Sequence, residues 1–354
     1  MKKVIFVLWH VSGKGGTETV VRTVVREMLK NHSHLRPQVY VLGGTEDTKW
    51  LENIHFGSSP YIRNKLFRVI PYFIWLMRYI RKENPDIVIG LSPMICLFLN
   101  TIRKITRKKY SIFSWIHFSL KANQMKKEWL KNADYHLAIS SGVRRQLVEL
   151  GIPNAKIFTI YNPVKRINTT IYRPEKIKVF VYVGRITFDG QKRISDMFTA
   201  LSLVSGPWHL DIVGDGDDVD QCKKYAEQLN ISQKISWNGW KQDPWSVINR
   251  ATALLLTSSY EGFPMVLTEA ISRGVYCVSS DCEVGPSDII KKDINGELYE
   301  VGNSEALKQI LQEIVDGKYL PDQDQMKASL EPFYLEHYYE SFIKAIENII
   351  ERNL

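Results

Sequence analysis

The chain has 354 residues, of which 44% are hydrophobic and 24% charged, values typical of a soluble globular protein that is long enough for two domains. Its four cysteines form no CxxC pair and no cluster with histidine, which argues against a zinc site and favours reduced thiols. The net charge of +9 is unevenly distributed, because residues 1–170 carry 28 Lys and Arg against 10 Asp and Glu, whereas residues 171–354 carry 19 against 28. The basic first half predicts an anionic partner for the first domain.

The first residues, "MKKVIFVLWHVSGKGG", superficially resemble a secretory signal, with two lysines before an apolar run. The run is short, and a glycine loop follows it where a signal would have a small-residue cleavage site. We therefore expect residues 3–9 to form a buried strand. No apolar stretch in the chain approaches the ~20 residues that a membrane-spanning helix requires.

Near-continuous apolar runs in the first half predict parallel strands that are covered on both faces. These runs are residues 3–9, 38–43, 86–91, 110–116 and 135–140. Helical patterns separate them, for example over 15–31, 61–83 and 141–150. Strands that alternate with helices predict right-handed crossovers and a doubly wound sheet.

The glycine loop after the first run contains Gly13, Gly15 and Gly16, before a helix that we expect Thr17 to cap. It matches neither the GxGxxG pattern nor a Walker loop, because no Lys-Ser or Lys-Thr pair closes it. The loop could hold a phosphate, or it could be an ordinary turn between a strand and a helix.

Residues 61–82, "YIRNKLFRVIPYFIWLMRYIRK", combine cations with aromatic side chains, as interfacial membrane segments do. The cations are Arg63, Lys65, Arg68, Arg78, Arg81 and Lys82, and the aromatic residues are Phe67, Tyr72, Phe73, Trp75 and Tyr79. We expect Pro71 to bend any helix in this segment. The segment could contact lipid, or its aromatic side chains could fill the core of the first domain. A second basic cluster, "RKITRKK", follows at 103–109.

Residues 162–176 are rich in Pro, Asn, Thr and charge and predict a linker, after which a second set of strands begins. We expect these strands over 178–184, 209–214, 234–239, 253–258 and 275–280. The predicted fold class is therefore α/β, with two Rossmann-like doubly wound domains facing a central cleft. The boundaries are 1–165 for the first domain, 176–325 for the second domain, and 326–354 for a C-terminal helix that packs back across the joint.

Ligands of doubly wound sheets bind at the carboxyl ends of the strands. Arg185 follows the first strand of the second domain and Lys192 begins the next helix, and two such cations suit a diphosphate. The acidic run Asp215–Asp218 could hold a metal, but carboxylates in a polar loop before a helix are more often solvated caps. We therefore predict no metal.

The stretch "SSYEGFPMVLTEA", residues 258–270, places Glu261 in a glycine-proline loop and Glu269 inside the following helix. Pro264 suits the first position of that helix, so the free amides of Met265 and its neighbours would favour a phosphate. A ligand with a central diphosphate and hydroxyl groups on both sides would use both carboxylates.

The E-x7-E motif "EGFPMVLTE", with "GR" and a later lysine, resembles the retaining GT-B glycosyltransferases of family 4, and the likeness extends over nearly the whole chain. The stretches "FSWIHFSL", "ADYHLAISSG", "YNPV", "GQKR", "ALLLTS" and "NGELY" are similar to those of the lipopolysaccharide core 1,6-galactosyltransferases. Arg193 departs from the wider family, where glycine usually follows the lysine, but the galactosyl subgroup also has "QKR".

That resemblance implies a hexosyltransferase that uses UDP-galactose as donor, a lipid-linked core oligosaccharide as acceptor, and no cofactor. It implies ribose binding by Glu269, hexose binding by Glu261, and neutralisation of the diphosphate by Arg185 and Lys192. The further donor-binding residues that it implies are Gly16, Val183, Val213, Trp240, Phe263, Pro264, Met265 and Val266. His117, which follows the strand over 110–116, would face the donor sugar, although a histidine at such a position is more often structural. Glu18 would lie on the acceptor side.

Retention often involves two carboxylates in a double displacement, in which one of them forms a covalent intermediate with the sugar. The sequence offers no clear nucleophile, and the family resemblance implies a front-face reaction in which the leaving phosphate takes the acceptor proton. The basic charge of the first domain, together with the anionic and membrane-anchored acceptor that the resemblance implies, predicts a peripheral protein on the cytoplasmic face of the inner membrane, in contact with anionic lipid.

Three other functions fit parts of the sequence. The donor could be another UDP-hexose with another surface glycan as acceptor, or the protein could be a UDP-sugar epimerase of the same architecture. A nucleic-acid binder could use the basic domain, but no RNP, zinc-finger or basic-repeat signature supports that function, so we expect no nucleic-acid partner.

Overall fold

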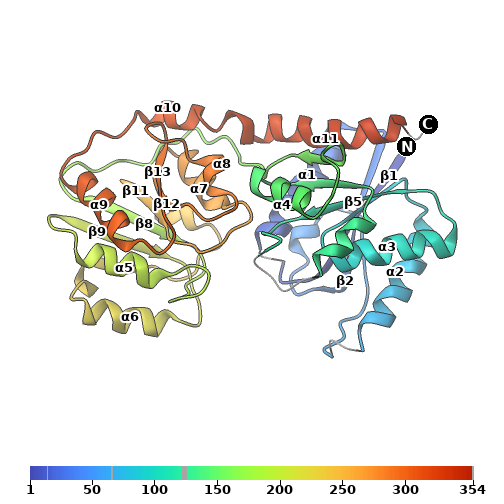
Figure 1. The fold of residues 1–354 in the computed structure, drawn as a ribbon, viewed down its shortest axis with the longest axis horizontal. Helices are drawn as coiled ribbons and strands as arrows, with labels where there is room; N and C mark the ends of the chain where they lie inside the picture. The colour runs from blue at the N-terminus through green and yellow to red at the C-terminus, as the bar shows by residue number, and fades with distance from the viewer. Residues whose placement is uncertain (14, 65–66, 122–125, 353–354) are drawn as a thin grey trace. The chain divides into compact units, whose positions relative to one another are not determined.

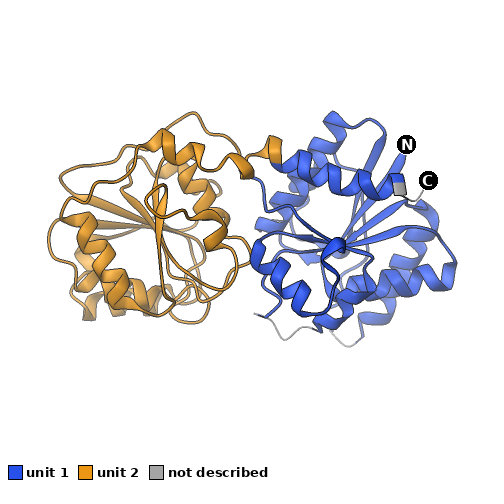
Figure 2. Ribbon diagram, turned by 45° about the horizontal axis from the view of Figure 1, so that its top comes forward, with its two compact units in different colours: residues 1–163, 338–354 blue, residues 164–337 orange. Residues whose placement is uncertain are grey.

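The structure, a computed structural model, describes residues 1–13, 15–64, 67–121 and 126–352. The chain divides into two compact units (Figure 2). Unit 1 combines Met1–Pro163 with Tyr338–Leu354, and unit 2 is the continuous segment Val164–His337. The last residues of the chain therefore belong to the same unit as the first.

Unit 1 contains a seven-stranded sheet in the order β3-β2-β1-β4-β5-β6-β7, and every pair of neighbouring strands is parallel. The strands are β1 Lys2–Val11, β2 Leu35–Thr45, β3 Phe56–Ser58, β4 Ile87–Gly90, β5 Ser111–Ile116, β6 Tyr135–Ala138 and β7 Ile157–Thr159. The helices are α1 Gly16–Asn31, η1 Lys49–Leu51, α2 Val69–Glu83, α3 Pro93–Thr106, η2 Lys127–Asn132, α4 Ser141–Glu149, η3 Asn154–Lys156 and most of α11 Leu335–Arg352. Helices α1 and α11 lie on one face of this sheet, and α2 and α3 lie on the other (Figure 1).

Unit 2 repeats the architecture with a six-stranded parallel sheet in the order β10-β9-β8-β11-β12-β13. Its strands are β8 Lys178–Val183, β9 Trp208–Val213, β10 Ile235–Trp237, β11 Ala253–Leu256, β12 Tyr276–Ser280 and β13 Gly296–Tyr299. Its helices are α5 Ile194–Ser202, α6 Val219–Gln228, η4 Ser232–Lys234, η5 Pro244–Val247, α7 Met265–Ile271, α8 Pro286–Ile289, α9 Ser304–Val315, α10 Gln323–Ala328 and η6 Glu331–Phe333. The predicted fold of two doubly wound domains is thus confirmed.

The continuous apolar runs form the central strands because both faces of each sheet are covered. Val4, Ile5, Phe6 and Val7 of β1 are all fully buried. The ten predicted strands are all present, and the structure adds the short edge strands β3 and β7 and the four-residue strand β13.

The helix expected over 61–83 begins only at Val69. Pro71 therefore lies in the first turn, where its missing N–H leaves no intrahelical bond unmade, so it does not bend the helix as predicted. Lys65, one of the cations in this segment, lies outside the described residues.

The aromatic side chains of α2 pack mostly within unit 1. Tyr72 is buried, Phe73 meets the ring of Phe98 edge to face, and Tyr79 stacks on Tyr40 with ring centroids 4.2 Å apart. Phe67, just before the helix, is 73% exposed, and Ile70 in the first turn is 71% exposed. Of the two alternatives left open by the sequence, core packing therefore accounts for most of the aromatic residues in this segment.

Helices that the structure describes are all too short or too polar to cross a membrane.

The C-terminal helix predicted over 326–354 is not continuous in the structure, because its first residues belong to α10, η6 follows, and α11 begins at Leu335. Pro332 in η6 interrupts the pattern because it has no backbone N–H to donate. Beyond the break, Phe342 of α11 packs against Phe6 and Trp115 in unit 1, with ring centroids 6.4 and 5.5 Å apart.

Candidate functional site

A cavity of about 370 Å³ opens at the carboxyl ends of β8 and β9 in unit 2. Val183, Arg185, Val213 and Trp240, four of the predicted donor-binding residues, all line it. Trp240 is 55% exposed, so its indole offers a flat apolar surface at the mouth. The volume is within the range of small-molecule sites.

Glycine allows the loops around this cavity to approach one another closely. A Cβ on Gly214 would lie 1.8 Å from the carbonyl oxygen of Gly184, and one on Gly216 would lie 2.0 Å from that of Ile186. The amide of Gly214 also donates to the carbonyl oxygen of Gly239 over 2.9 Å. These contacts hold the segments that follow β8, β9 and β10 together, so the cavity is preformed.

Lys192 lies in the loop between β8 and α5, and its Nζ donates to Oε1 of Glu261 over 2.7 Å. Its backbone is also held, because its amide donates to Thr187 Oγ1 and its carbonyl oxygen accepts from Thr257 Oγ1. The pair is largely buried, with side-chain exposures of 15% for Lys192 and 10% for Glu261. This ion pair, which the sequence did not predict, fixes the position of both side chains.

Arg185 belongs to the same loop and is held by a different contact. Its Nη2 donates to Oε1 of Gln191 over 2.9 Å, and Gln191 in turn donates to the carbonyl oxygen of Tyr260. The loop that carries both predicted diphosphate cations is therefore fastened to the loop that carries Glu261.

Helix α7 begins one residue later than expected, because Pro264 is its N-cap and Met265 its first residue. Phe263 is buried against Phe333, with ring centroids 5.5 Å apart, and Pro264 is also buried. Met265 and Val266 remain partly exposed. The helix has only seven residues, so a large macrodipole is not expected at its start.

Glu269 accepts a hydrogen bond at Oε2 from Nε1 of Trp245 over 3.0 Å. Arg273 stacks over the Trp245 ring, with its Cζ 4.8 Å from the ring centroid. Burial raises the pKa of the Glu269 carboxyl, and the Trp245 hydrogen bond and the Arg273 charge oppose that rise. The sequence analysis did not identify Trp245. The only local signal for it is that it ends the turn sequence "DPW".

Gly16, Glu18 and His117 lie in unit 1. The helix that starts at Gly16 is capped by Gly15, and the expected Thr17 cap is wrong, since Thr17 lies inside the helix. Glu18 is 5% exposed and accepts at Oε1 from the amides of Gly13 and Gly15 over 3.1 and 3.2 Å. The carboxylate thus shapes the glycine loop.

His117 directly follows β5, and its ring lies 4.6 Å from that of Trp115. Burial lowers the pKa of this imidazole to about 3, so the ring is neutral at physiological pH. Its buried Nε2 has no hydrogen-bond partner in the described part of the chain. A buried polar atom without a partner is uncommon in a folded protein, and a ligand hydroxyl could reach this nitrogen only if the side chains that cover it moved.

Carboxylates of the acidic run after β9 accept hydrogen bonds from backbone amides. Asp215 Oδ1 accepts from the amide of Gly216, and Asp218 Oδ2 accepts from the amide of Phe188 over 2.9 Å. No group of three or more His, Cys, Asp or Glu side chains is placed to hold a metal within residues 1–13, 15–64, 67–121 and 126–352.

Comparison with known proteins gives a consistent result for both halves of the chain. The model of Glycosyltransferase Family 4 matches residues 14–166, and that of Glycosyl transferases group 1 matches residues 165–329. The chain is 39% identical to the lipopolysaccharide 1,6-galactosyltransferase of Escherichia coli K12, over 99% of each chain. It is 38% identical to the enzyme of that name from Salmonella typhimurium, over 99% of this chain and 100% of the relative.

Solved structures share the fold. The apo form of the lipopolysaccharide outer core galactosyltransferase WaaB superposes with a TM-score of 0.90 at 39% identity, over 98% of this chain and 99% of that one. HepE of Anabaena in complex with UDP-glucose superposes with a TM-score of 0.80 at 16% identity, over 98% of this chain and 100% of that one. The predicted GT-B architecture is thereby confirmed.

Proposed function

The chain belongs to the family 4 glycosyltransferases, and from that premise we propose that it transfers galactose from UDP-galactose to the lipopolysaccharide core. The observation that carries this proposal is the 39% identity to a lipopolysaccharide 1,6-galactosyltransferase along 99% of both chains. Likeness of that extent includes both units of the chain. A UDP-sugar epimerase is not favoured, because the relatives matched over the whole chain are transferases.

The uracil and ribose bind in the cavity beside β8 and β9. Trp240 stacks on the base between Val183 and Val213, because an exposed indole at the mouth of an apolar slot suits a flat heterocycle. Glu269 accepts the ribose hydroxyls at Oε1, since Oε2 already accepts from Trp245. Phe263 and Pro264 form the buried part of the loop before α7. Met265 and Val266, in the first turn of α7, are partly exposed beside the donor.

The diphosphate binds between Arg185 and Lys192. An ammonium has three N–H donors, so Lys192 keeps its bond to Glu261 and offers two more to phosphate oxygens. The guanidinium of Arg185 pairs with two oxygens at once. These two cations supply the positive charge at the leaving group, and the proposed reaction therefore requires no metal.

In the reaction, the bond between the galactose C1 and the phosphate oxygen breaks, and a bond forms between C1 and an acceptor oxygen. The acceptor proton passes to the departing UDP phosphate, on the same face of the sugar, and the anomeric configuration is retained. Glu261 and His117 bind hydroxyls of the hexose, and the carboxylate stabilises the positive charge that develops on the ring. Gly16 contacts the donor phosphates, and Glu18 orders the glycine loop on the acceptor side.

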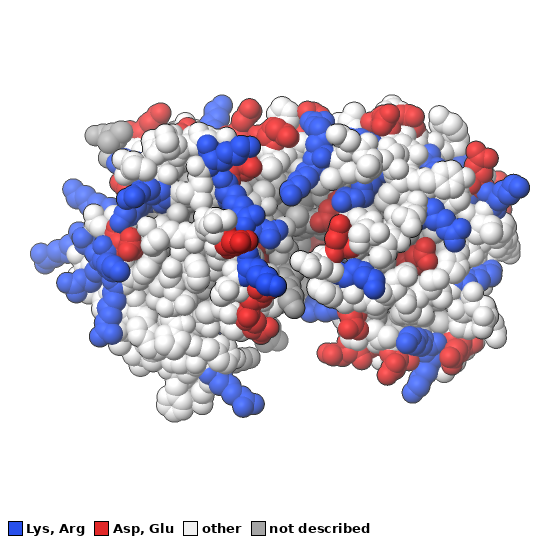
Figure 3. All heavy atoms as spheres, turned by 180° about the vertical axis from the view of Figure 1, so that it is seen from behind, with Lys and Arg blue, Asp and Glu red and all other residues white. Residues whose placement is uncertain are grey.

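We also propose that the protein works at the cytoplasmic face of the inner membrane as a peripheral protein. Lys and Arg side chains gather over unit 1 in Figure 3. Phe67 and Ile70 are strongly exposed at the start of α2, and Arg78, Arg81 and Lys82 are exposed along the helix. A few exposed apolar side chains next to cations favour anionic lipid surfaces.

Assays of UDP release test the transferase and its donor together. UDP-galactose, UDP-glucose and other UDP-hexoses are each incubated with and without core oligosaccharides truncated before the galactose. We expect UDP release that is fastest with UDP-galactose and that requires the acceptor. Conversion of the sugar nucleotide without acceptor would identify an epimerase, and equal rates with another UDP-hexose would overturn the choice of donor.

A further inference from the structure

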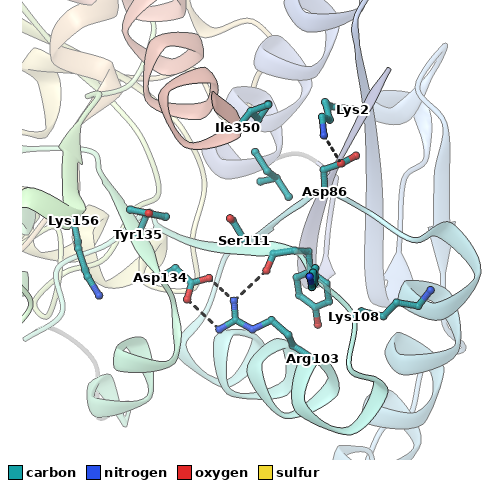
Figure 4. A pocket seen from close by; sticks show the side chains of 12 residues that line it. Lys2, Asp86, Arg103, Lys108, Ser111, Asp134, Tyr135, Lys156 and Ile350 are labelled. Atoms are coloured by element: carbon teal, nitrogen blue, oxygen red, sulfur yellow. Dashed lines mark hydrogen bonds and ion pairs between the residues drawn. The ribbon is translucent and has the colours of Figure 1, made fainter. Parts of the chain in front are cut away.

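Unit 1 contains a second hollow, of about 700 Å³, at the amino edge of its sheet (Figure 4). Its lining includes Lys2 at the start of β1, Ser111 at the start of β5, Tyr135 at the start of β6, and Ile350 of α11. Because all strands of this sheet are parallel, their carboxyl ends, including the end of β5 that precedes His117, lie at the opposite edge. The hollow is therefore separate from the site described above.

Both carboxylates in the lining are already occupied. Asp134 accepts from both terminal nitrogens of Arg103 and from the amide of Ile112. Asp86 accepts from Lys2 Nζ over 3.1 Å and from the amide of Lys3 over 2.8 Å. These bonds fix the beginnings of the strands, so neither acid is available to neutralise other charges in the hollow.

Three lysines in the lining have no carboxylate partner among the described residues. Lys108 Nζ donates to the neutral amide oxygen of Asn84 over 2.7 Å. Lys109 and Lys156 are exposed, and no hydrogen bond or ion pair holds their ammonium groups within the described chain. A concave surface with several unpaired cations concentrates positive potential and attracts anions.

We propose that this hollow binds a phosphate-bearing ligand. Lys108 and Lys156 lie on opposite sides of the hollow (Figure 4), so a ligand that reaches both carries anionic oxygens at more than one point. Diphosphates, phosphorylated sugars and phospholipid headgroups have this chemistry, and lysine ammonium groups bind their oxygens as point charges. The ring of Tyr135 lies between Lys156 and Ser111 and offers an apolar surface beside them.

The variant Lys109→Ala/Lys156→Ala tests this site, because neither side chain holds the fold through any bond in the described structure. Its matched control is Lys30→Ala/Lys224→Ala, which removes the same charge from two exposed lysines outside the hollow. In the first arm, each full-length protein is saturated with UDP to fill the donor site and is titrated with inorganic pyrophosphate by calorimetry. In the second arm, each is sedimented with vesicles of phosphatidylglycerol or of phosphatidylcholine.

We expect the wild type and the control to bind pyrophosphate or phosphatidylglycerol vesicles, and the double variant to bind at least about tenfold more weakly. A loss confined to the pyrophosphate arm identifies a soluble phosphate as the ligand, and a loss confined to vesicles identifies a lipid headgroup. The proposal is overturned if the wild type binds neither probe, if the double variant binds both probes as tightly as the wild type, or if the control loses as much binding as the double variant. Donor turnover does not enter either arm, and the double variant keeps Arg78, Arg81 and Lys82 of α2, so a loss confined to this variant is assigned to the hollow and not to the proposed membrane surface of α2.

Discussion

Lys192 and Glu261 lie 69 positions apart in the sequence and form a 2.7 Å hydrogen-bonded ion pair between two loops of unit 2. Each charge is largely buried and depends on the other for compensation. Removal of one partner should therefore destabilise the fold more than replacement of both partners. A single deletion leaves an unpaired charge in a site with little water.

Lys192→Ala should reduce turnover by roughly 10²-fold or more, since it removes a donor to the leaving diphosphate and leaves Glu261 unpaired. Steady-state kinetics with saturating UDP-galactose and acceptor measure this effect. Lys224→Ala, at an exposed lysine of the same unit, is the matched control and should keep full turnover. A Lys192→Ala enzyme that turns over at the rate of this control would remove Lys192 from the diphosphate site.

Substitution of Glu269 and of Glu261 should have different effects on UDP binding and on turnover. Glu269→Ala should weaken UDP binding by about 1–3 kcal/mol, because a charged acceptor for the ribose hydroxyls is lost. Glu261→Ala should lower turnover more than it changes UDP affinity, because its partner in the donor is the hexose and it acts on UDP only through its ion pair with Lys192. Calorimetry with UDP alone and turnover with the intact donor give the two readouts, and the reverse pattern would exchange the roles.

Acidification should weaken UDP binding through Glu269. Burial raises the pKa of this carboxyl above its ordinary value of 4.5, so it becomes protonated at a higher pH than an exposed glutamate and then accepts hydrogen bonds poorly. As the pH is lowered, UDP affinity should therefore begin to fall at a higher pH than it would with a glutamate of ordinary pKa. The Glu269→Gln variant corrects for protonation of UDP itself, and identical pH profiles in the two proteins would contradict the assignment.

The raised pKa of Glu269 also predicts that the Glu269→Gln variant is at least as stable as the wild type. A raised carboxyl pKa means that the folded chain binds the proton more tightly than the unfolded chain, so this group lowers the free energy of unfolding as pH rises through its folded pKa. Glu269→Gln removes that cost and keeps an oxygen to accept from Trp245. At neutral pH the variant should therefore denature at a urea concentration equal to or above that of the wild type. A clear decrease would show that the charge stabilises the fold.

Activity should survive EDTA, because Arg185 and Lys192 provide the positive charge at the diphosphate. Turnover measured before and after chelation, with manganese added back, tests this expectation. Activity that disappears in EDTA and returns with manganese would place the diphosphate at Asp215–Asp217 instead.

The protein should sediment with anionic vesicles at low salt. Neutralising Arg78, Arg81 and Lys82 together should weaken that binding, at roughly 1 kcal/mol for each well-placed cation. Phe67→Ser/Ile70→Ser should weaken it further, through the two exposed apolar side chains. Binding that ignores both salt and lipid charge would mean that the basic surface serves a soluble part of the acceptor.

Elements with a long buried pattern could be predicted from the sequence, and elements defined by their neighbours could not. Strand β1, which contains Ile5, was evident because its apolar run has to be covered on both faces of the sheet. Strands β3 and β13, "FGS" and "GELY", are too short to show a period and form only because a longer strand pairs with them.

The proposed donor site shows the same division. The proximity of the loops that carry Arg185 and Glu261 could be predicted, because each loop follows a strand of the second sheet and strand ends meet at one edge. The bonds of Trp245 to Glu269 and of Glu18 to the glycine loop depend on how loops fold against each other. No local pattern in the sequence specifies such contacts.

The path of the chain into and out of unit 2 has a consequence for protein engineering. Val164, the first residue of this unit, donates its amide hydrogen to Phe333 and accepts one from the amide of Leu335, near the last residue, His337. The two ends of a 174-residue segment, Val164–His337, are thus fastened side by side, as in segments that tolerate insertion into or removal from a host domain. The segment can therefore be exchanged for its counterpart from a related enzyme. The chimaera should acquire the nucleotide-sugar specificity of that enzyme, and the remainder of the chain should keep its own acceptor specificity.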